Sequence, residues 1–379
     1  MVTPSALSPI LLGTLEGRPT HVGITVIVCC HNSSRLLPTT LEHLARQEVS
    51  PDVEWELVVV DNASIDGTGT VARHCWPAGH RASLTVVEEP RLGLAHARAC
   101  GIAHARFEFL AFVDDDNWLE SSWVQAALEV FRDKPDVGAV GSTIAPEFET
   151  SRPVWFDLVA NLYATGPSPD IVGDVTTRHV PCGAGLCIRR SALADAQRKQ
   201  LTTISVGRTG SALTAGEDCE IIYCLRLTGW RVWIEPRLRV RHFLPARRLG
   251  WVYARQLAYW SAHATAERDA LVYACKPPRH GVSLIVRRLR ETWAWQCLAV
   301  ALRLVTMPGA FGRVARSNSE GDGEVLRLEM LRGRLQGLIA ARAWYATRSF
   351  EVREAMKHIA RETRRARLDT RLGGEMAGA

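Results

Sequence analysis

The sequence of 379 residues lacks the two glycine-rich motifs that most often mark a nucleotide site. No G-x-G-x-x-G string follows the first predicted strand, which excludes the usual dinucleotide-binding form of an α/β sheet. No G-x-x-x-x-G-K-[ST] string occurs either, which excludes a P-loop. Neither of these two nucleotide-binding classes therefore fits the chain.

Paired cysteines with the spacing of a metal site are also absent. The chain has ten cysteines but no C-x-x-C pair, and several cysteines lie in apolar runs that read as strands. We therefore predict buried, reduced thiols in a reducing compartment rather than a disulfide framework. Residues 1–20 have neither a basic first region nor a long apolar stretch, so we expect a loose lead-in and no signal peptide.

Long hydrophobic runs are scarce in the C-terminal half. In the apolar segment Val282–Met307 the longest uncharged run is Thr292–Leu302, far shorter than the ~20 residues that a spanning helix needs. Two interpretations remain open. The segment lies in a bilayer interface, with Trp293 and Trp295 at the depth of the headgroups, or it forms a pair of helices packed on the rest of the protein.

The charge is distributed unevenly along the chain. Residues 1–235 hold 19 basic and 28 acidic residues, whereas residues 236–379 hold 27 and 12, a net charge of +15. Such a basic half favours a polyanionic partner, and from charge alone nucleic acid, anionic lipid and a polyanionic product all remain open.

The most informative stretch is Glu108–Glu120, which reads E-F-L-A-F-V-D-D-D-N-W-L-E. Its apolar run Phe109–Val113 is typical of a strand buried on both faces. Three carboxylates follow at once, Asp114–Asp116, and three neighbouring like charges need a positive partner. A divalent cation shared with a diphosphate suits such a place at the carboxyl end of a strand. The alternative is an acidic turn that caps a helix at Ser121.

Strands and helices alternate at short intervals in the first half of the chain. The predicted strands are Gly23–Cys30, Glu54–Val60, Ser83–Glu88, Phe109–Val113 and Val137–Ile144. The predicted helices between them are Leu36–Gln47, Arg91–Gly101 and Ser121–Phe131. This order predicts an α/β fold with a mostly parallel sheet and right-handed crossovers. The residues that follow the strands should then meet at one edge of the sheet.

The second half of the chain changes character. We predict a wall of loops over 146–178, a mobile loop over 201–216 and a helix over Cys219–Leu227 that starts at Glu217 and Asp218. Two short strands follow, Arg231–Glu235 and Leu238–His242. Beyond them the pattern is helical, with helices over Leu249–Tyr273 and Gly321–Phe350 and a frayed basic tail from residue 361.

Together these segments resemble family-two glycosyltransferases of the GT-A fold, over about Gly23 to Arg248. The motifs that carry the resemblance occur in the expected order: V-I-V-C-C-H-N, V-V-V-D-N-A-S-I-D-G-T, G-L-A-H-A-R-A-C-G, F-V-D-D-D-N, C-G-A-G, G-E-D and the late His242. The resemblance implies a division into a lead-in (1–20), a GT-A domain (21–248) and a basic helical region (249–379).

The resemblance also implies a role for each residue that matches a motif. The residues implied to bind the nucleotide sugar are Cys30, His31, Asn32, Asp61, Arg98, Asp114 and Asp115. Those implied to hold a divalent metal, Mn²⁺ or Mg²⁺, are Asp116 and His242. Asp218 resembles the general base and Glu217 a neighbour that positions the acceptor. The segment on the acceptor side comprises Cys182, Gly183, Ala184 and Gly185.

The chemistry of these residue types suits metal-dependent, inverting transfer of a single sugar to a hydroxyl acceptor. A metal neutralises the leaving diphosphate, and one carboxylate base suffices for direct attack. The string Gln256–Trp260 lacks the arginine of the processive Q-x-x-R-W segment, so we expect single transfer rather than polymerisation. The expected partners are a nucleotide sugar, a glycan or lipid-linked acceptor and an anionic membrane surface, without nucleic acid.

Three other classes remain as alternatives. A nucleotidyltransferase usually carries a glycine-rich loop after its first strand, which this chain lacks. A metal-dependent hydrolase of nucleotide sugars would release free sugar, and a non-catalytic carbohydrate- or lipid-binding protein would show no turnover. We expect the protein to be cytoplasmic, peripheral on the inner face of the membrane.

Overall fold

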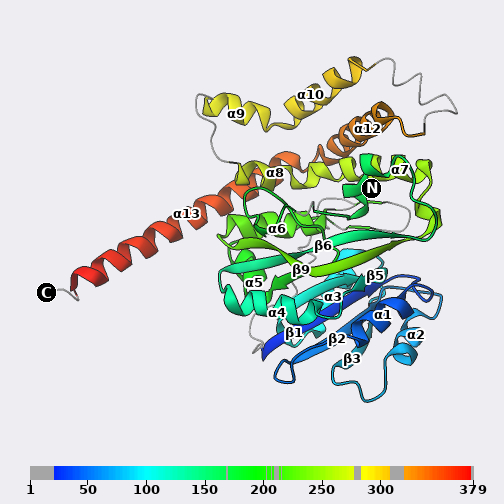
Figure 1. Cartoon of the computed structure of the whole chain (residues 1–379). Helices are drawn as coiled ribbons and strands as arrows, with labels where there is room; N and C mark the ends of the chain where they lie inside the picture. The colour runs from blue at the N-terminus through cyan, green and yellow to red at the C-terminus, as the bar shows by residue number, and fades with distance from the viewer. Residues whose placement is uncertain are drawn as a thin grey trace.

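A computed structural model describes residues 21–376 except 168–169, 202, 206, 209–212, 215, 277–282 and 308–319. The predicted lead-in over residues 1–20 lies outside the described residues. Figure 1 shows a twisted sheet flanked by helices, with a group of C-terminal helices along one side of it.

One half of the sheet is parallel. Its strands, in spatial order, are β3 (Ser83–Glu88), β2 (Trp55–Asp61), β1 (His21–Cys30) and β4 (Phe107–Asp114). The helices that connect them are α1 (Leu37–Ala45), α2 (Thr68–Cys75) and α3 (Leu94–His104). The register aligns Cys30 with Asp61 and Cys29 with Asp114, so these strands end at one edge as predicted.

The other half of the sheet is mixed. Its strands continue the spatial order as β8 (Leu186–Arg189), β6 (Val137–Phe148), β9 (Arg231–Leu244) and β5 (Asn117–Leu119), and β7 (Gly173–Asp174) pairs with β9. The helices on this half are α4 (Trp123–Asp133), α5 (Arg190–Arg198) and α6 (Glu217–Leu227). The prediction of two short strands after residue 230 was wrong, because β9 runs through both. A register shift against β6, between Gly141 and Thr143, accommodates the intervening residues within one strand.

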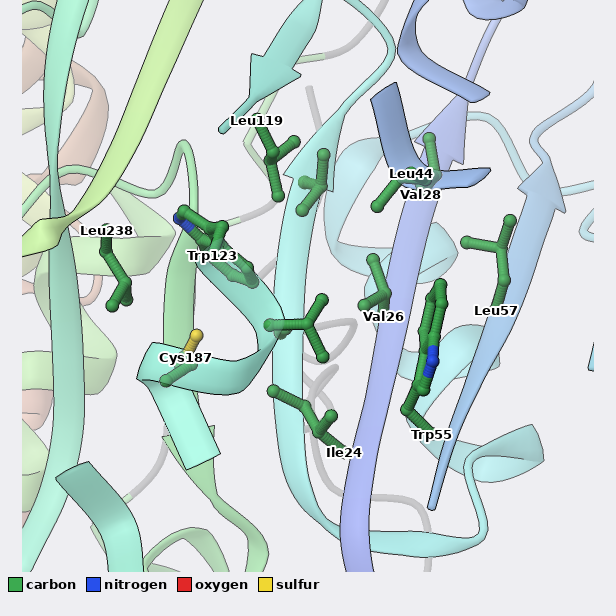
Figure 2. Close-up of a cluster of buried hydrophobic side chains, with 14 of the residues drawn as sticks. Ile24, Val26, Val28, Leu44, Trp55, Leu57, Leu119, Trp123, Cys187 and Leu238 are labelled. Carbon is green, nitrogen blue, oxygen red and sulfur yellow. The ribbon is translucent and has the colours of Figure 1, made fainter. Parts of the chain in front are cut away.

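Both faces of the sheet are buried. Ile24, Val26 and Val28 of β1 belong to the cluster drawn in Figure 2, together with Trp55 and Leu57 of β2. The residues that alternate with them, including Ile27 and Val58, belong to a second cluster under α3, α5 and α6. This alternation gives each face its own core, which explains why the strands read as uninterrupted apolar runs.

Loops and short helices cover the carboxyl edge of the sheet. They include the 3₁₀ helices η2 (Phe156–Leu158), η3 (Ala160–Tyr163) and η4 (Ala246–Arg248). Trp155, Phe156 and Tyr163 are buried in a third cluster, against residues of the first C-terminal helix. The segment predicted as a wall therefore joins the sheet to the C-terminal helices. The predicted mobile loop over 201–216 lies partly outside the described residues, and Leu201 and Ser205 within it are buried.

The C-terminal helices are more numerous than predicted. Among the described residues they are α7 (Trp251–His263), α8 (Thr265–Cys275), α9 (Leu284–Arg290), α10 (Trp293–Val305), α12 (Gly323–Ala341) and α13 (Tyr345–Met376). The helix predicted over Leu249–Tyr273 is divided into α7 and α8, and the one predicted over Gly321–Phe350 into α12 and the start of α13. Helices α7 and α12 pack on each other, and α8 packs on α13. The tail predicted to fray is helical to Met376, and Figure 1 shows α13 extending away from the sheet.

Helix α12 lies unusually close to α7. A Cβ atom at Gly333 would lie 2.0 Å from the carbonyl oxygen of Tyr259, and one at Gly337 would lie 2.1 Å from that of His263. Glycine is therefore required at both positions for the two backbones to approach.

We predict that Gly333→Ala lowers the free energy of unfolding by about 1–3 kcal/mol, the usual cost of overpacking. Gly323→Ala in the first turn of the same helix is the control, because no atom lies within 4 Å of its added Cβ. Urea unfolding of both variants measures the difference. Equal stability of Gly333→Ala and the wild type would contradict this close approach.

Candidate active site

A cavity of about 580 Å³ opens at the carboxyl edge of the sheet. Its size is typical of small-molecule sites, which span roughly 300–1,000 Å³. The residues that line it and carry polar side chains include His31, Asn62, Arg98, Asp114, Asp115, Asp116, Arg208, Glu217, Asp218, His242, Arg247, Arg248 and Tyr253. The structure thus brings most of the residues singled out in the sequence to one place, from elements far apart in the chain.

Strand pairing explains why His242 meets the aspartates. The short strand β5 begins one residue after Asp116 and pairs antiparallel with β9, so that Asn117 lies opposite His242. The N–H of Phe243 donates to the Asp116 carbonyl at 2.8 Å. As a result the His242 Nε2 lies 3.4 Å from the Asp116 Oδ1, and both side chains are buried.

The orientation of His242 bears directly on metal binding. Its Nδ1 lies 2.9 Å from the carbonyl oxygen of Tyr163, and because a carbonyl only accepts, Nδ1 carries the hydrogen. A neutral imidazole then turns the Nε2 lone pair toward the Asp116 carboxylate. Two acceptors at this distance need a proton or a metal ion between them. This donor set, with its histidine fixed by a backbone carbonyl, fits a divalent cation.

These two side chains do not complete a metal site by themselves. Among the described residues, no group of three or more His, Cys, Asp or Glu side chains is arranged to hold a metal ion. Mg²⁺ commonly takes one or two protein carboxylates and completes its coordination with substrate phosphates and water. The observed pair therefore fits a cation that shares its ligands with a bound diphosphate.

Arg248 was not predicted from the sequence to belong to the site, yet it contacts Asp116 directly. Its Nη1 lies 2.7 Å from the Asp116 Oδ2, on the side of the carboxylate away from His242. Burial tends to raise the pKa of Asp116, but His242 and Arg248 outweigh burial and hold that pKa well below its usual range. Asp116 is therefore an anion clamped between two basic side chains.

The other two carboxylates of the triplet have different surroundings. Burial raises the pKa of Asp114, with a further contribution from Asp116 and an opposing one from Arg98. Burial and Asp116 likewise raise the pKa of Asp115, to about 7, although its carboxylate accepts a hydrogen bond from the Ser33 hydroxyl. The three aspartates are thus not equivalent, because the pKa of Asp116 is lowered whereas the pKa values of Asp114 and Asp115 are raised.

A buried ion pair crosses the floor of the cavity. Arg98 on α3 lies 3.0 Å from the Glu217 Oε1 on α6, and both side chains are almost fully buried. The Glu217 Oε2 also accepts the N–H of Gly216 at 3.1 Å. Both oxygens of Glu217 are therefore engaged within the protein.

Asp218 is the carboxylate that remains available. It lines the cavity, is half-buried and forms no ion pair with any described residue, while its Oδ1 accepts the N–H of Cys219 at 2.7 Å. A Cβ atom at Gly183 would lie 2.8 Å from the Arg98 Nη2 and 3.1 Å from the Asp218 Oδ2. Glycine at position 183 thus lets the backbone of the acceptor-side segment approach both groups.

The predicted nucleotide-binding loop is only partly in the cavity. Cys30 and His31 line it, and His31 Nδ1 lies 2.7 Å from the Asn62 carbonyl. Asn32 does not line the cavity; its Oδ1 accepts the N–H of Ile65. Asp61 does not line it either, since its carboxylate accepts backbone N–H groups of the following turn, including that of Gly69 at 3.0 Å.

The predicted acceptor-side segment divides in the same way. Gly183 and Ala184 line the cavity, but Cys182 and Gly185 do not. The Gly185 carbonyl instead accepts the Ser142 hydroxyl at 2.7 Å, so this residue fixes the strand behind the cavity. The roles implied for these four residues remain predictions.

Sequence reasoning missed several residues that line the cavity: Asn62, Arg208, Arg247, Arg248 and Tyr253. Asn62 follows a strand within the quoted D-N-A-S motif, so its position was the available signal. Arg247 and Arg248 follow His242 closely, but nothing in the sequence shows that the chain turns back there. Gln256 and Trp260, from the string that resembles the processive segment, line a separate groove between α7 and α12.

The fold agrees with comparisons to known proteins. Residues 25–195 match the family described as Glycosyl transferase family 2. The chain contains a family 2 glycosyltransferase domain.

Individual relatives are distant. The chain is 27% identical over 255 residues to the pre-mycofactocin glycosyltransferase of Mycobacterium tuberculosis, which covers 65% of this chain and 48% of that protein. It is 21% identical over 264 residues to the glucosyl-dolichyl phosphate glucuronosyltransferase of Haloferax volcanii, covering 65% and 78%. The chain thus spans about half the length of the mycobacterial relative.

A solved structure shows the same fold. The mannosyltransferase of Pyrobaculum calidifontis, in complex with GDP-Man and Mn²⁺, aligns with a TM-score of 0.51 at 19% identity. The alignment covers 87% of this chain and 88% of that one, so it includes C-terminal helices as well as the glycosyltransferase domain. The prediction of a GT-A fold is confirmed.

Glu220 is a buried carboxylate on the same helix as Glu217 and Asp218. It lies one turn after Glu217 on α6, is fully buried, and its Oε2 accepts the N–H groups of Ile204 and Ser205, each at 2.9 Å. Burial raises the pKa of Glu220 to about 7, against the opposing effect of Arg348. The folded protein therefore binds this proton more tightly than the unfolded chain does.

We predict that Glu220→Gln reduces the pH dependence of stability. The stabilising effect of the protonated Glu220 is complete below the unfolded pKa of about 4.3 and is lost as pH rises to about 7. The stability of the variant relative to the wild type should therefore rise across this window, by up to about 3–4 kcal/mol. Urea unfolding from pH 4 to 8 measures it, with exposed Glu42→Gln as the control. A constant difference at all pH values would contradict the assignment.

Proposed function

We propose that this chain transfers a single sugar from a nucleoside-diphosphate sugar to an acceptor hydroxyl, with inversion at the anomeric carbon, in polysaccharide or glycoconjugate biosynthesis. One observation carries the proposal. In a single cavity of a family 2 domain, the Asp116–His242 pair suited to a cation lies together with Asp218, a carboxylate without an ion pair. These are the two groups that glycosyl transfer with inversion requires, a neutraliser of the leaving diphosphate and a base.

The donor side of the cavity is assigned to the ends of β1 and β4. His31 and Asn62 border the place where the base and ribose would lie, and Asp114 and Asp115 lie next to them. The solved mannosyltransferase with this fold binds GDP-Man and Mn²⁺, which supports a nucleotide sugar and a divalent metal, Mn²⁺ or Mg²⁺, in this chain too. Asp116 and His242 would hold the metal, which supplies positive charge to the leaving diphosphate.

The acceptor side is assigned to Gly183, Ala184 and Asp218. Asp218 takes the proton from the acceptor hydroxyl as the new glycosidic bond forms, so that the attacking oxygen is an effective nucleophile. The N-terminus of α6 favours a negative charge at this position. Glu217 keeps Arg98 in place and contributes through that ion pair.

The archaeal relative is named for a dolichyl phosphate acceptor, and this supports a lipid-linked acceptor. The cavity lining also includes apolar and arginine side chains, among them Leu213 and Arg208. Such a wall suits an acceptor that combines a sugar with a phosphate-linked lipid.

Replacement of Asp218 tests the proposed base without disturbing the neighbouring Arg98–Glu217 ion pair. We predict that Asp218→Asn slows transfer by about 10²–10⁴-fold, the usual contribution of general-base catalysis. Donor affinity and thermal stability should change little, because the variant keeps an oxygen that accepts the Cys219 N–H. The rate of nucleoside diphosphate release with acceptor present and the equilibrium affinity for the donor provide the two readouts.

Glu217→Gln is the matched comparison for that variant. It weakens the partner of a buried arginine, so it should lower stability, by up to the ~3–5 kcal/mol that a broken buried ion pair costs. A folded Glu217→Gln that is inactive beside an active Asp218→Asn would assign the base to Glu217. Release of free sugar at the full rate without acceptor would instead favour a hydrolase.

Metal dependence has its own test in nucleotide binding. We predict that Mn²⁺ strengthens the binding of a nucleoside diphosphate to the wild type, and that Asp116→Asn weakens this enhancement by about 100-fold or more. Even outer partners of a metal site contribute about 10–100-fold. Calorimetric titrations with Mn²⁺ and with EDTA measure the effect. Equal affinity of the wild type in both solutions would show that Asp116 and His242 hold no metal.

A further inference from the structure

Helix α10 has two apolar faces, and only one of them has a partner. Val300, together with Trp293, Cys297 and Leu304, packs against α12 and its neighbours. The indole N–H of Trp293 also donates to the Leu338 carbonyl at 2.6 Å. These positions recur at helical spacing, so they define the inner face of α10.

A second stripe lies on the outer face of the same helix. Trp295, Leu298, Leu302 and Val305 are spaced three, four and three residues apart, and their exposed fractions are 44%, 51%, 59% and 77%. A helix that is apolar on nearly all sides is normally buried or in contact with lipid. In the described part of the chain, however, nothing covers this stripe.

The preceding helix continues the surface. Leu284, Ile285 and Leu289 on α9 are exposed by 69%, 72% and 56%. None of the α9 side chains belongs to a hydrophobic cluster among the described residues. Figure 1 shows α9 and α10 on the side of the C-terminal helices away from the sheet. We call the exposed apolar residues of these two helices the α9–α10 surface.

The charges around the α9–α10 surface favour an anionic partner. Arg288, Arg290 and Arg303 are exposed and form no ion pair with any described residue. Neither helix contains an acidic residue, and Glu291, which lies between them, is already paired with Arg287 at 2.9 Å. A second copy docked on the same surface would bring arginines against arginines, whereas anionic headgroups would pair with them.

We propose that the α9–α10 surface binds the interface of an anionic lipid bilayer. The outer-face leucines enter the boundary between headgroups and acyl chains, Trp295 lies at headgroup depth, and the arginines contact phosphates. Binding is peripheral: among the described residues, no helix is both long and apolar enough to cross a bilayer. The inference does not depend on the proposed transfer reaction, although it places the enzyme where a lipid-linked acceptor would be found.

The test is sedimentation of the full-length protein with vesicles of phosphatidylcholine alone or mixed with phosphatidylglycerol. The wild type should bind the anionic vesicles strongly, bind neutral ones weakly, and dissociate partly as salt rises, since screening weakens headgroup contacts. Leu298→Glu/Leu302→Glu should reduce partitioning by tenfold or more, about the value of one buried leucine. Val154→Glu, which replaces a residue exposed by 96% elsewhere, should bind as the wild type does.

Arg288→Gln/Arg290→Gln is a second variant that leaves the apolar face intact. It should weaken binding to anionic vesicles about fivefold per arginine and leave binding to neutral vesicles unchanged. Light scattering without lipid gives the oligomeric state of every variant. Absence of binding to anionic vesicles, or equal binding by Leu298→Glu/Leu302→Glu and the wild type, would overturn the proposal. A dimer that only this leucine variant dissociates, without vesicle binding by the wild type, would assign the surface to a second copy.

Discussion

The crowding of three aspartates at the end of β4 is the constraint on which the rest of the site depends. Asp114–Asp116 lie at the end of a strand that is buried on both faces. Asp116 is buried, and Asp114 and Asp115 are half-buried in the cavity, so solvent screens their charges only in part. The protein compensates them from three directions, with Arg98 on α3, His242 on β9 and Arg248 after it. Each of these basic side chains comes from a different part of the chain, and each therefore requires the whole sheet to be assembled.

Arg98 and Arg248, which both compensate the aspartates, are not held equally firmly. Arg98 is locked by Glu217 and buried beneath Gly183, so it forms a fixed part of the cavity floor. Arg248 ends a short 3₁₀ helix at the rim and touches only one oxygen of Asp116. A diphosphate that enters together with a divalent cation would offer both Asp116 and Arg248 a new partner. Arg248 is thus suited to neutralise Asp116 before donor binding and the donor afterwards.

The sequence predicted this site as far as local pattern allows. Apolar runs ending in His31, Asp61 and Asp114 indicated one sheet edge, because parallel strands with short crossovers leave no other arrangement. The resemblance implied different roles for Glu217 and Asp218, a neighbour that positions the acceptor and the general base, and these roles remain predictions. The position of Arg98 on α3 shows that Glu217 is the carboxylate already engaged in an ion pair. The nucleotide-binding role implied for Asp61 remains a prediction. In the structure its carboxylate accepts the Gly69 N–H, and a carboxylate that caps a turn and one that binds a ligand look alike in sequence.

Long-range geometry explains the remaining omissions. Arg248 reaches Asp116 only because β9 continues through a bulge and pairs with β5, and a Pro–Arg interruption in the sequence suggested two separate strands. The division of the C-terminal helices was also hidden, because hydrophobic spacing continues across each break. The sequence did not show which side of α10 is exposed, because that depends on which side packs against α12.

We propose that the residues of this cavity transfer a sugar from a nucleotide donor to an acceptor. The most direct measurement incubates the full chain with Mn²⁺, a panel of nucleoside-diphosphate sugars and a lipid extract, and follows products by mass spectrometry and their anomeric configuration by NMR. We expect one donor to add a single sugar mass to a lipid-linked acceptor, with inverted configuration, and we expect this product to be lost in Asp218→Asn. Free sugar as the sole product, or a product of retained configuration, would contradict this proposal.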